Sequence, residues 1–367
     1  NDGKSSAKPF KTLCKAREVV QANQVIGLMD GAYDNTTQRP AGWNLSFPCG
    51  PTFNEPVVLE ALSSGKAVVR VPLLLNQGGV VRGIKLDTER GDAGVITAGS
   101  IQMSAGTTTI RSLSVGDVFS APNAKTAPLV VSALAKVTLI AGDVASYTTQ
   151  PVPNGAGLSF AFVGGELTIE GGMFDDSAAN NADTYCNPLF EGSGKVTLKG
   201  VTVHHKGTVM RATTNATVSF EQGSVLENRA TAPNLGCVPV IGVLGAITSM
   251  NLNGATVRGG ASGLETEPGV GSGPITITNS TFEALSKYAI NLTGTTLKVR
   301  GSTIKSGDVG IRVVAPATTD LGTAGDVGGN TLTGATTALR VETTTVVNAA
   351  GNTWTANQQG ADAQGKY

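Results

Sequence analysis

The stretch Val196–Val203, which reads VTLKGVTV, recurs in altered form along this chain. Apolar residues stand at its first, third and eighth positions, and copies carry a Gly, Asn or Gln at the fifth. Alternating apolar residues indicate a β-strand with one buried face, and the small central residue lets the backbone turn with a positive φ. The pattern therefore predicts two short strands joined by a sharp turn. The other close copies are Leu167–Phe174, Val218–Val225, Met250–Val257, Ile275–Phe282 and Leu297–Ile304.

The spacing of these copies predicts the architecture. They begin 22 to 32 residues apart, and a third short strand can be placed before each of them, for example at Pro188–Phe190 or Tyr288–Ile290. Self-similar units of this length, built of strands and turns, indicate a solenoid whose coils pair with their neighbours. We predict an all-β chain that forms a single right-handed parallel β-helix of about 12 coils. Looser copies extend the series at Ile26–Tyr33, Gly79–Leu86, Thr108–Val115, Val137–Val144, Gly325–Leu332 and Val347–Trp354.

The composition agrees with an all-β solenoid and narrows the choice of partners. Gly accounts for 48 of the 367 residues, while charged residues make up 15% and aromatic residues 5%. The 27 basic and 27 acidic residues cancel, which disfavours nucleic acid or an anionic membrane as a partner because both require a basic surface. No apolar run is long enough to predict a transmembrane segment.

The two ends of the chain differ from the repeats. The sequence PFKTLCKA at Pro9–Ala16 predicts a short helix with Pro9 at its first position, and this helix would cover the open end of the solenoid. The chain begins at Asn1 without an apolar signal region, so we expect a mature or trimmed form. The predicted division is an N-terminal cap at 1–56, a β-helix at 57–354 and a polar tail at 355–367.

The four cysteines predict disulfides. Cys186 and Cys237 each lie 19 residues after the start of a close copy, which places them on the same side of the solenoid. We predict the pairs Cys14–Cys49 and Cys186–Cys237, and therefore an oxidising compartment. Four separate buried thiols are the alternative. No cysteine has a C-x-x-C neighbour, so no metal site is expected.

Each predicted third strand carries one outward residue directly after an inward one. Parallel β-helix lyases and hydrolases keep catalytic carboxylates and basic residues on such a face. Glu191 beside Arg211, or Glu265 with Glu267, are therefore candidate catalytic groups. The sequence favours a structural ladder of surface charges instead, in which each pair contributes roughly a few tenths of a kcal/mol. Stacked coils would align Glu191, Arg211, Gly242, Glu265, Asn291, Arg312 and Arg340.

Two further features of the sequence are candidates for a functional role. His204 and His205 are the only histidines of the chain. They could serve a metal or act as a base, but without an evident third ligand we expect solvated surface side chains. The glycine-rich segment Gly259–Gly273 predicts either a flexible binding loop or a long turn between coils.

Both ends of the chain also carry motifs of a known family. The sequences PFKTLCKA at 9–16 and DGAYD at 30–34 resemble the opening of a family of bacterial secreted parallel β-helix proteins, described only as a domain of unknown function. DLGT at 320–323 and GNTW at 351–354 are similar to that family's closing elements. Asn23-Gln24 stands where the family has Gly-Asp. The resemblance implies a right-handed β-helix in a secreted or cell-surface setting, and no reaction.

The sequence therefore favours a non-enzymatic role. We expect an extracellular or cell-surface structural or adhesive protein that self-assembles or binds a surface glycan. The alternative is a carbohydrate-active enzyme, a polysaccharide lyase or glycosidase, on the same scaffold. A third hypothesis is a trimeric receptor-binding spike of the phage type. No cofactor is expected for the favoured role.

Overall fold

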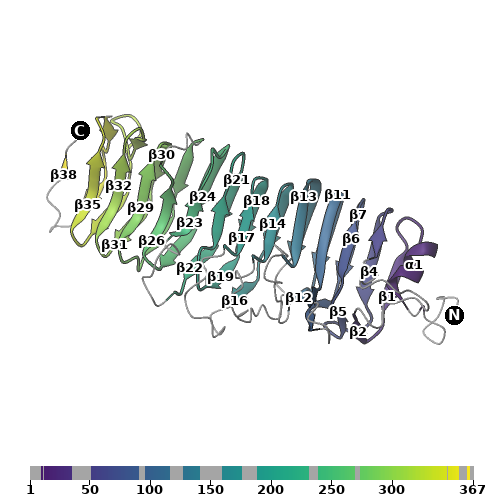
Figure 1. The fold of residues 1–367 in the computed structure, drawn as a ribbon. Helices are drawn as coiled ribbons and strands as arrows, with labels where there is room; N and C mark the ends of the chain where they lie inside the picture. Colours follow the sequence, from purple (N-terminus) through teal and green to yellow (C-terminus); the bar gives the residue numbers. More distant parts are fainter. Residues whose placement is uncertain are drawn as a thin grey trace. The chain divides into compact units, whose positions relative to one another are not determined.

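The computed structural model describes residue 10 and residues 12–34, 51–90, 96–115, 127–140, 159–175, 188–230, 239–268, 273–344, 346–354 and 362–363. The chain divides into two compact units, Asn1–Asn181 and Ala182–Tyr367. Each unit is a stack of parallel β-strands, so the prediction of an all-β parallel solenoid is confirmed (Figure 1). Within the described part of the chain, no helix is long and apolar enough to cross a membrane.

Unit 1 winds its strands into coils with three sides (Figure 1). One side stacks β1 (Val25–Leu28), β4 (Val57–Ala61), β7 (Gly78–Arg82), the end of β11 (Ser100–Arg111), the end of β13 (Leu129–Ile140) and β15 (Glu166–Glu170). A second side stacks β2 (Gly31–Tyr33), β5 (Ala67–Val69), β8 (Ile84–Leu86) and β12 (Ser114–Val115). The third side stacks β3 (Thr52–Phe53), β6 (Pro72–Leu75), the starts of β11 and β13, and β14 (Ala161–Val163). β9 (Thr88–Arg90) and β10 (Ile96–Ala98) form an antiparallel hairpin, and β16 (Met173–Asp175) ends the described part of this unit.

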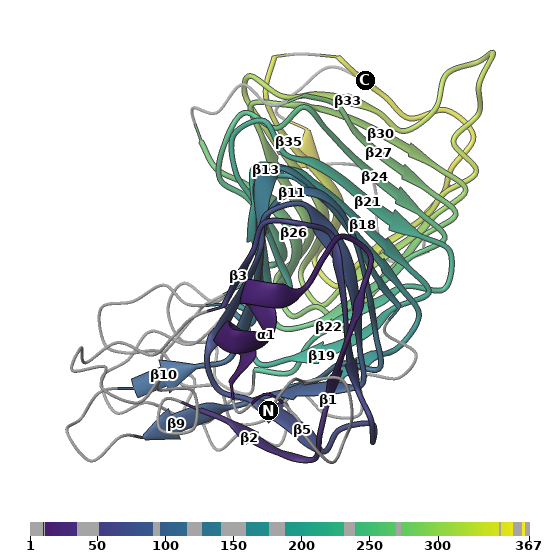
Figure 2. The same ribbon diagram turned by 90° about the vertical axis from the view of Figure 1, so that its right-hand side faces the viewer.

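The predicted N-terminal helix is confirmed, but its start is shifted. Helix α1 runs over Leu13–Val19. Thr12 is its N-cap, because the Thr12 hydroxyl accepts a hydrogen bond from the Lys15 backbone N–H at 3.1 Å. Pro9, predicted as the first helical residue, lies outside the described residues. α1 buries Leu13 and Ala16 and lies across the end of the first coils of unit 1 (Figure 2).

In unit 2 each coil contributes one strand to each of three faces, as predicted (Figure 1). Face 1 consists of β17 (Phe190–Gly192), β20 (Met210–Ala212), β23 (Pro239–Val243), β26 (Ser262–Thr266), β29 (Tyr288–Thr293), β32 (Val309–Val314), β35 (Thr337–Glu342) and β38 (Asp362–Ala363). Face 2 consists of β18 (Lys195–Lys199), β21 (Thr217–Glu221), β24 (Ser249–Asn253), β27 (Ile275–Thr278), β30 (Thr296–Arg300), β33 (Thr318–Asp320) and β36 (Val347–Asn348). Face 3 consists of β19 (Thr202–His205), β22 (Val225–Asn228), β25 (Thr256–Gly259), β28 (Thr281–Glu283), β31 (Thr303–Ser306), β34 (Thr331–Gly334) and β37 (Thr353–Trp354).

The apolar positions of the repeat form the core of unit 2. The third residues of successive copies are aligned by the strand register and are 0% exposed. Full burial of one such side chain stabilises the fold by about 1.5–3 kcal/mol. The interior is therefore held by columns of like side chains that run from coil to coil. One such column is Leu198, Phe220, Leu252, Ile277 and Val299.

The turn residue of the repeat has the backbone conformation that the sequence predicted. Its φ lies between 48° at Asn279 and 72° at Gly351 in six of the copies in unit 2. One copy departs from the predicted frame: in Val218–Val225 the positive φ is at Gly223 instead of Gln222. The register pairs Val203 with Leu226, and Leu226 is the buried residue. This turn therefore contains one residue more than the others.

Buried polar side chains connect the turns of neighbouring coils. The Ser280 N–H donates to Ser302 Oγ at 3.1 Å, and the Ser302 N–H donates to Asn330 Oδ1 at 2.9 Å. The Asn330 N–H donates in turn to Asn352 Oδ1 at 3.1 Å. At the turns the strand ladder stops, so these side chains satisfy backbone groups that would otherwise be buried without a partner. Asn352, which belongs to the GNTW element at 351–354, thus has a structural role in joining the turns.

The remaining predictions about the ends and the cysteines are tested only in part. β1 and β2, which the sequence placed in the cap, pair in parallel with β4 and β5 and belong to the first coil. β38, in the predicted tail, pairs with β35. Cys14 is disulfide-bonded. Cys49, Cys186 and Cys237 lie outside the described residues, so the two predicted pairings stay predictions.

Candidate functional site

The outward stripe predicted from the sequence exists on face 1. The strand register aligns Glu191 with Arg211, Arg211 with Gly242, and Gly242 with Glu265. It continues from Glu265 through Asn291 and Arg312 to Arg340. Neighbouring parallel strands lie about 4.8 Å apart, so these seven positions form a continuous row across the coils. We call this row the face 1 ladder.

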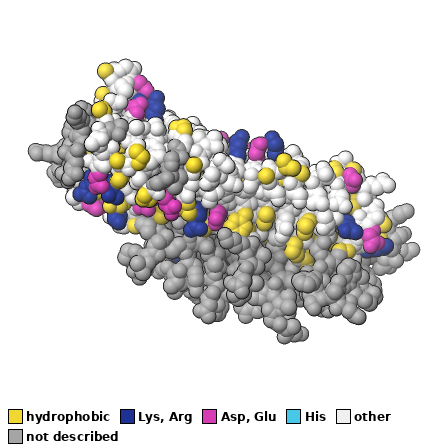
Figure 3. All heavy atoms as spheres, turned by 45° about the horizontal axis from the view of Figure 1, so that its top comes forward, with side chains coloured by type: hydrophobic (Ala, Val, Ile, Leu, Met, Phe, Trp, Pro, Cys, Tyr) yellow, Lys and Arg dark blue, Asp and Glu magenta, His cyan; other side chains and the backbone are white. Residues whose placement is uncertain are grey.

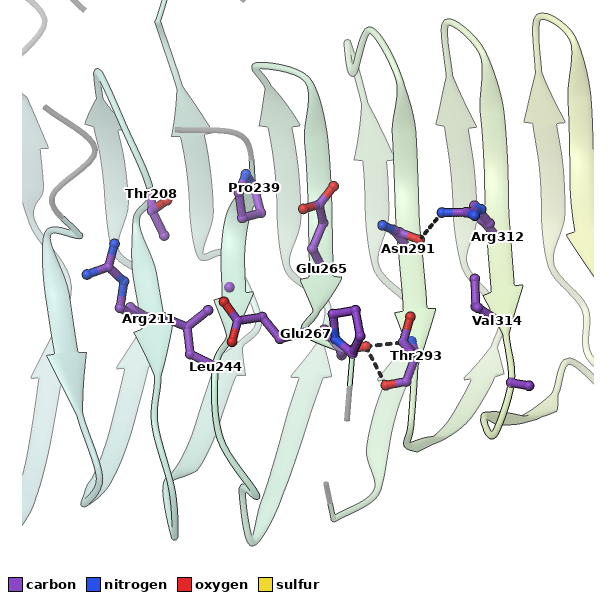
Figure 4. Close-up of a pocket in the computed structure, with 14 residues that line it drawn as sticks. Thr208, Arg211, Pro239, Leu244, Glu265, Glu267, Asn291, Thr293, Arg312 and Val314 are labelled. Atoms are coloured by element: carbon purple, nitrogen blue, oxygen red, sulfur yellow. Dashed lines mark hydrogen bonds between the residues drawn. The ribbon is translucent and has the colours of Figure 1, made fainter. Parts of the chain in front are cut away.

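A groove of about 570 Å³ runs along the middle of the face 1 ladder (Figure 4). Arg211 and Leu244 lie on one side, Arg312 and Val314 lie on the other, and Glu265 is between them (Figure 4). The groove crosses five successive coils, from β20 to β32. The remaining lining residues are Thr208, Pro239, Gly242, Thr266, Glu267, Pro268, Asn291, Thr293 and Ala315.

Gly242 leaves a gap in the ladder that deepens the groove. Its φ is not positive, so the backbone does not require glycine at this position. A Cβ atom at Gly242 would meet Pro239 Cγ at 3.5 Å and Thr208 Cγ2 at 4.0 Å, which are ordinary contacts. A larger side chain would therefore fit the fold and would point into the groove.

The basic residues at both ends of the groove are held by carboxylates. Arg211 Nη1 lies 3.6 Å from Glu191 Oε2. Arg312 donates two hydrogen bonds to Glu342, from Nε at 3.1 Å and from Nη2 at 2.6 Å. This hydrogen bonding raises the pKa of Arg312 and lowers the pKa of Glu342. Both guanidinium groups are thus positioned and largely neutralised before any ligand binds.

Glu265 and Glu267, the two carboxylates in the middle of the groove, differ from Glu191 and Glu342 in their lack of described partners. Neither Glu265 nor Glu267 forms an ion pair or a side-chain hydrogen bond with any residue that the structure describes. The Glu267 N–H donates to the Val243 carbonyl at 3.0 Å, so the strand pairing continues past the end of β26. Alternate strand residues lie about 6.6 Å apart and point to the same side of the sheet. The groove therefore presents two neighbouring carboxylates to solvent.

The catalytic candidates predicted from the sequence do not all lie in the groove or close to one another. Glu191 and Arg211 are neighbours at one end, but Glu191 does not line the groove. Glu191 and Glu265 are three coils apart, or roughly 14 Å at the usual strand spacing. Two carboxyl groups that act together on a glycosidic bond stand about 5–9.5 Å apart. Among these residues only Glu265 and Glu267, two residues apart along one strand, are near enough in the fold to reach such a separation.

The glycine-rich segment Gly259–Gly273 was predicted to be a flexible binding loop or a long turn, which is wrong for Ser262–Thr266, while residues 269–272 lie outside the described residues. Ser262–Thr266 form β26, the strand that carries Glu265. Gly263 is required by close packing, because a Cβ atom there would lie 2.6 Å from the Ala289 carbonyl oxygen and 2.7 Å from Phe282. Glycine here marks a crowded strand instead of a flexible one.

The two histidines are buried, so the prediction of solvated surface side chains was wrong. His204 is 9% exposed and His205 is 7% exposed. His204 Nδ1 lies 2.5 Å from Glu227 Oε2. Glu227 also binds Arg229 Nε at 3.0 Å and Arg258 Nη2 at 3.1 Å. The sequence pattern missed this cluster because its members come from three different coils.

His204, Glu227 and Arg258 form a second row of aligned residues, the face 3 ladder. Burial raises the pKa of Glu227, but hydrogen bonds from His204 and Arg258 outweigh it and hold the pKa below its ordinary value. Within the described ranges, no group of three or more His, Cys, Asp or Glu side chains is placed to hold a metal ion.

Charged side chains elsewhere in unit 2 also form pairs between coils. Arg300 Nη2 lies 2.8 Å from both Asp320 Oδ2 and Asp326 Oδ2, and Lys298 Nζ lies 2.9 Å from Asp326 Oδ2. On the face drawn in Figure 3, basic and acidic side chains lie next to one another instead of gathering into patches of one sign. Glu265 and Glu267 form no such pair with a described residue, and they differ from other carboxylates of unit 2 in lining the groove.

Comparison of the chain with models of protein families, with curated proteins and with solved structures gave no match.

Proposed function

We propose that this protein is an extracellular or cell-surface adhesive module that binds an extended glycan in the groove of face 1 without cleaving it. The observation that carries the proposal is the groove itself, in which polar side chains from successive coils line one continuous depression. A repeating scaffold that places its side chains at a fixed spacing suits a ligand that is also a linear repeat.

The size and the lining of the groove support this ligand class. From the Arg211 strand to the Arg312 strand there are four coil steps, or about 19 Å, which accommodates about four sugar residues. Asn291 and the two terminal Arg residues supply hydrogen-bonding groups, while Pro239, Leu244 and Val314 supply apolar surface. Ligand sites generally combine apolar walls with a few convergent polar groups.

The test is a binding screen of the purified full chain against neutral, acidic and basic oligosaccharides, followed by titration calorimetry. The proposal expects saturable binding of at least one oligosaccharide, and loss of that binding in a variant with a filled groove. Absence of binding across the whole screen, or binding that survives filling of the groove, would contradict it.

A glycosidase on the same scaffold is the second candidate, and the spacing of Glu265 and Glu267 favours it. Their backbone positions are about 6.6 Å apart, which allows the two carboxyl groups the separation of about 6.5–9.5 Å that inverting enzymes need to hold one water molecule between them. Release of reducing ends from an oligosaccharide, abolished in both Glu265→Gln and Glu267→Gln, would establish this function. Release of unsaturated ends would establish a lyase instead.

The cellular setting is part of the same proposal. The disulfide at Cys14 and the family resemblance at both ends of the chain support a secreted or cell-surface location in a bacterium. Self-assembly, also expected from the sequence, stays a proposal. Analytical ultracentrifugation over a wide range of concentrations tests it, and a single sedimenting species of monomer mass would exclude it.

A further inference from the structure

The groove combines charges in a way that selects between glycans. We infer that it binds an amino-sugar polymer, a glycan that carries primary ammonium groups along its length. This inference rests on the proposed function, and it follows from which charges in the groove are paired and which are not.

At the two ends of the groove, each Arg residue is already paired with a carboxylate. Arg211 forms an ion pair with Glu191, and Arg312 donates two hydrogen bonds to Glu342. An acidic glycan that reached either guanidinium group would meet a charge that a carboxylate already balances. Replacing one carboxylate partner by another yields little net free energy, because each Arg is already neutralised.

At the centre of the groove, the carboxylates of Glu265 and Glu267 are not paired in this way. Glu265 and Glu267 have no ion-pair partner among the residues that the structure describes, and Gly242, which has no side chain, lines the groove beside them. Arg312 lies close enough for Glu265 to raise its pKa, although the two groups form no ion pair. The charge that remains available at the centre of the groove is therefore negative.

An amino sugar matches the charge of these carboxylates better than an acidic or a neutral sugar does. A uronate or sulfated sugar would place like charges beside Glu265 and Glu267, whereas a neutral sugar would leave both carboxylates without a charged partner. An ammonium group on the sugar ring pairs with a carboxylate in a charge-assisted hydrogen bond. Glu265 and Glu267 both project from the β26 coil, so an ammonium group on a sugar at the centre of the groove can pair with either of them.

The experiment compares three tetrasaccharides by calorimetry on the full chain at about pH 6, where amines and carboxylates are both charged. The probes are β-1,4-linked glucosamine, its fully N-acetylated counterpart and a galacturonate tetramer. The inference expects glucosamine to bind at least about tenfold more tightly than the N-acetylated form, with a preference that weakens as salt is added.

Variants assign the preference to the two carboxylates. The double variant Glu265→Gln, Glu267→Gln should lose the preference for glucosamine while its melting temperature stays unchanged. Glu283→Gln, on β28 of face 3, removes one negative charge far from the groove and should keep the preference. The single variants Glu265→Gln and Glu267→Gln should each give an intermediate result.

The possible outcomes separate this inference from the function on which it rests. If no tetrasaccharide binds, the proposed function fails. If the N-acetylated or the galacturonate tetramer binds as tightly as glucosamine, glycan binding stands and the amino-sugar inference is overturned. A preference that persists in the double variant overturns it as well.

Discussion

The face 1 and face 3 ladders of unit 2 are built by the same repeat but treat their charges differently. On face 3, Glu227 is surrounded by His204, Arg229 and Arg258, with contacts from 2.5 to 3.1 Å. On face 1, Glu265 occupies a similar outward position in the ladder and has no described ion-pair partner. Both carboxylates are aligned by parallel strand pairing, so the difference lies only in their neighbours.

The comparison shows how one scaffold serves two purposes. A carboxylate that satisfies several donors stabilises the coils that provide them, since each donor would otherwise lose a charged partner. A carboxylate without a partner contributes nothing comparable to the fold and is available to a ligand. Charge paired between coils thus has a structural role in this protein, whereas we propose a binding role for the groove carboxylates, which have no ion-pair partner among the described residues.

Filling the gap should have the largest effect. Gly242→Gln places a long side chain in the groove and is expected to reduce glycan affinity by at least about a hundredfold, because the ligand and the side chain compete for one space. The free energy of unfolding should change by less than about 0.5 kcal/mol. Titration calorimetry and thermal melting measure the two quantities.

Gly242→Ala is the matched control. Its single methyl group fits against Pro239 and Thr208 with ordinary contacts, so both affinity and stability should stay close to the wild-type values. Loss of binding in the Ala variant would mean that the backbone, and not the open space, makes the site.

Removing the charge of Glu227 should break the face 3 ladder. Glu227→Gln is expected to lower the free energy of unfolding by about 2 kcal/mol, because three donors lose their anionic partner. Glu265→Gln removes a charge from face 1 and should change stability by less than about 0.5 kcal/mol. Denaturant titrations of both variants measure the contrast, and equal destabilisation would show that the two ladders do not differ as described.

The contribution of Glu227 to the free energy of unfolding should also depend on pH. The pKa of Glu227 is lower in the folded protein than its ordinary value of 4.5. A depressed carboxyl pKa contributes stability that is complete above the ordinary value and is lost as the pH falls through the folded value. The stability difference between wild type and Glu227→Gln should therefore be constant near neutral pH and shrink below pH 4.5. A difference that instead grows on acidification would contradict this assignment.

Straining a turn between two faces should have a smaller effect. Gly200 joins β18 to β19 with a φ of 61°, and a Cβ atom there would meet no other atom within 4 Å. Gly200→Val should cost about 1–2 kcal/mol from backbone strain alone, and Gly200→Asn should cost less because Asn tolerates this conformation. Thermal melting of both variants checks the order, and equal melting temperatures would exclude backbone strain as the cause.

Removing one buried hydroxyl group should give the smallest effect and the opposite sign. Thr319 is 3% exposed, and its Oγ1 atom has no hydrogen-bond partner among the described residues. Thr319→Val keeps the shape of the side chain and removes the unsatisfied group, so the free energy of unfolding should rise by about 1 kcal/mol. Denaturant titration measures the change. A loss of stability would show that the hydroxyl group has a partner, such as an internal water molecule.

Much of the fold could be predicted from the repeat, and some details could not. The alternation of apolar residues and the turn residue predicted three strands per coil and the alignment from Glu191 to Arg340, which the strand register confirms. The extra residue at Gly223 was missed because Val225 and Leu226 are both apolar and either could complete the pattern. The segment around β26 was also taken for a loop or a turn, although Glu265 within it was placed in the outward row, because glycines that allow close packing look the same in a sequence as glycines that allow flexibility.

The candidate site shows where the sequence stops being informative. Glu191, Arg211 and Glu265 could be placed on one face, since side-chain direction in a strand follows from the residue's position in the repeat. Whether a charged side chain is paired depends on partners 20 to 31 residues away on neighbouring coils. Examples are the ion pairs of Arg312 with Glu342 and of Arg258 with Glu227. The parallel solenoid and its outward row were thus determined by the local period of the chain. The groove, the burial of His204 and the availability of Glu265 were decided only by the tertiary structure, because pairing between coils joins residues that no local pattern relates.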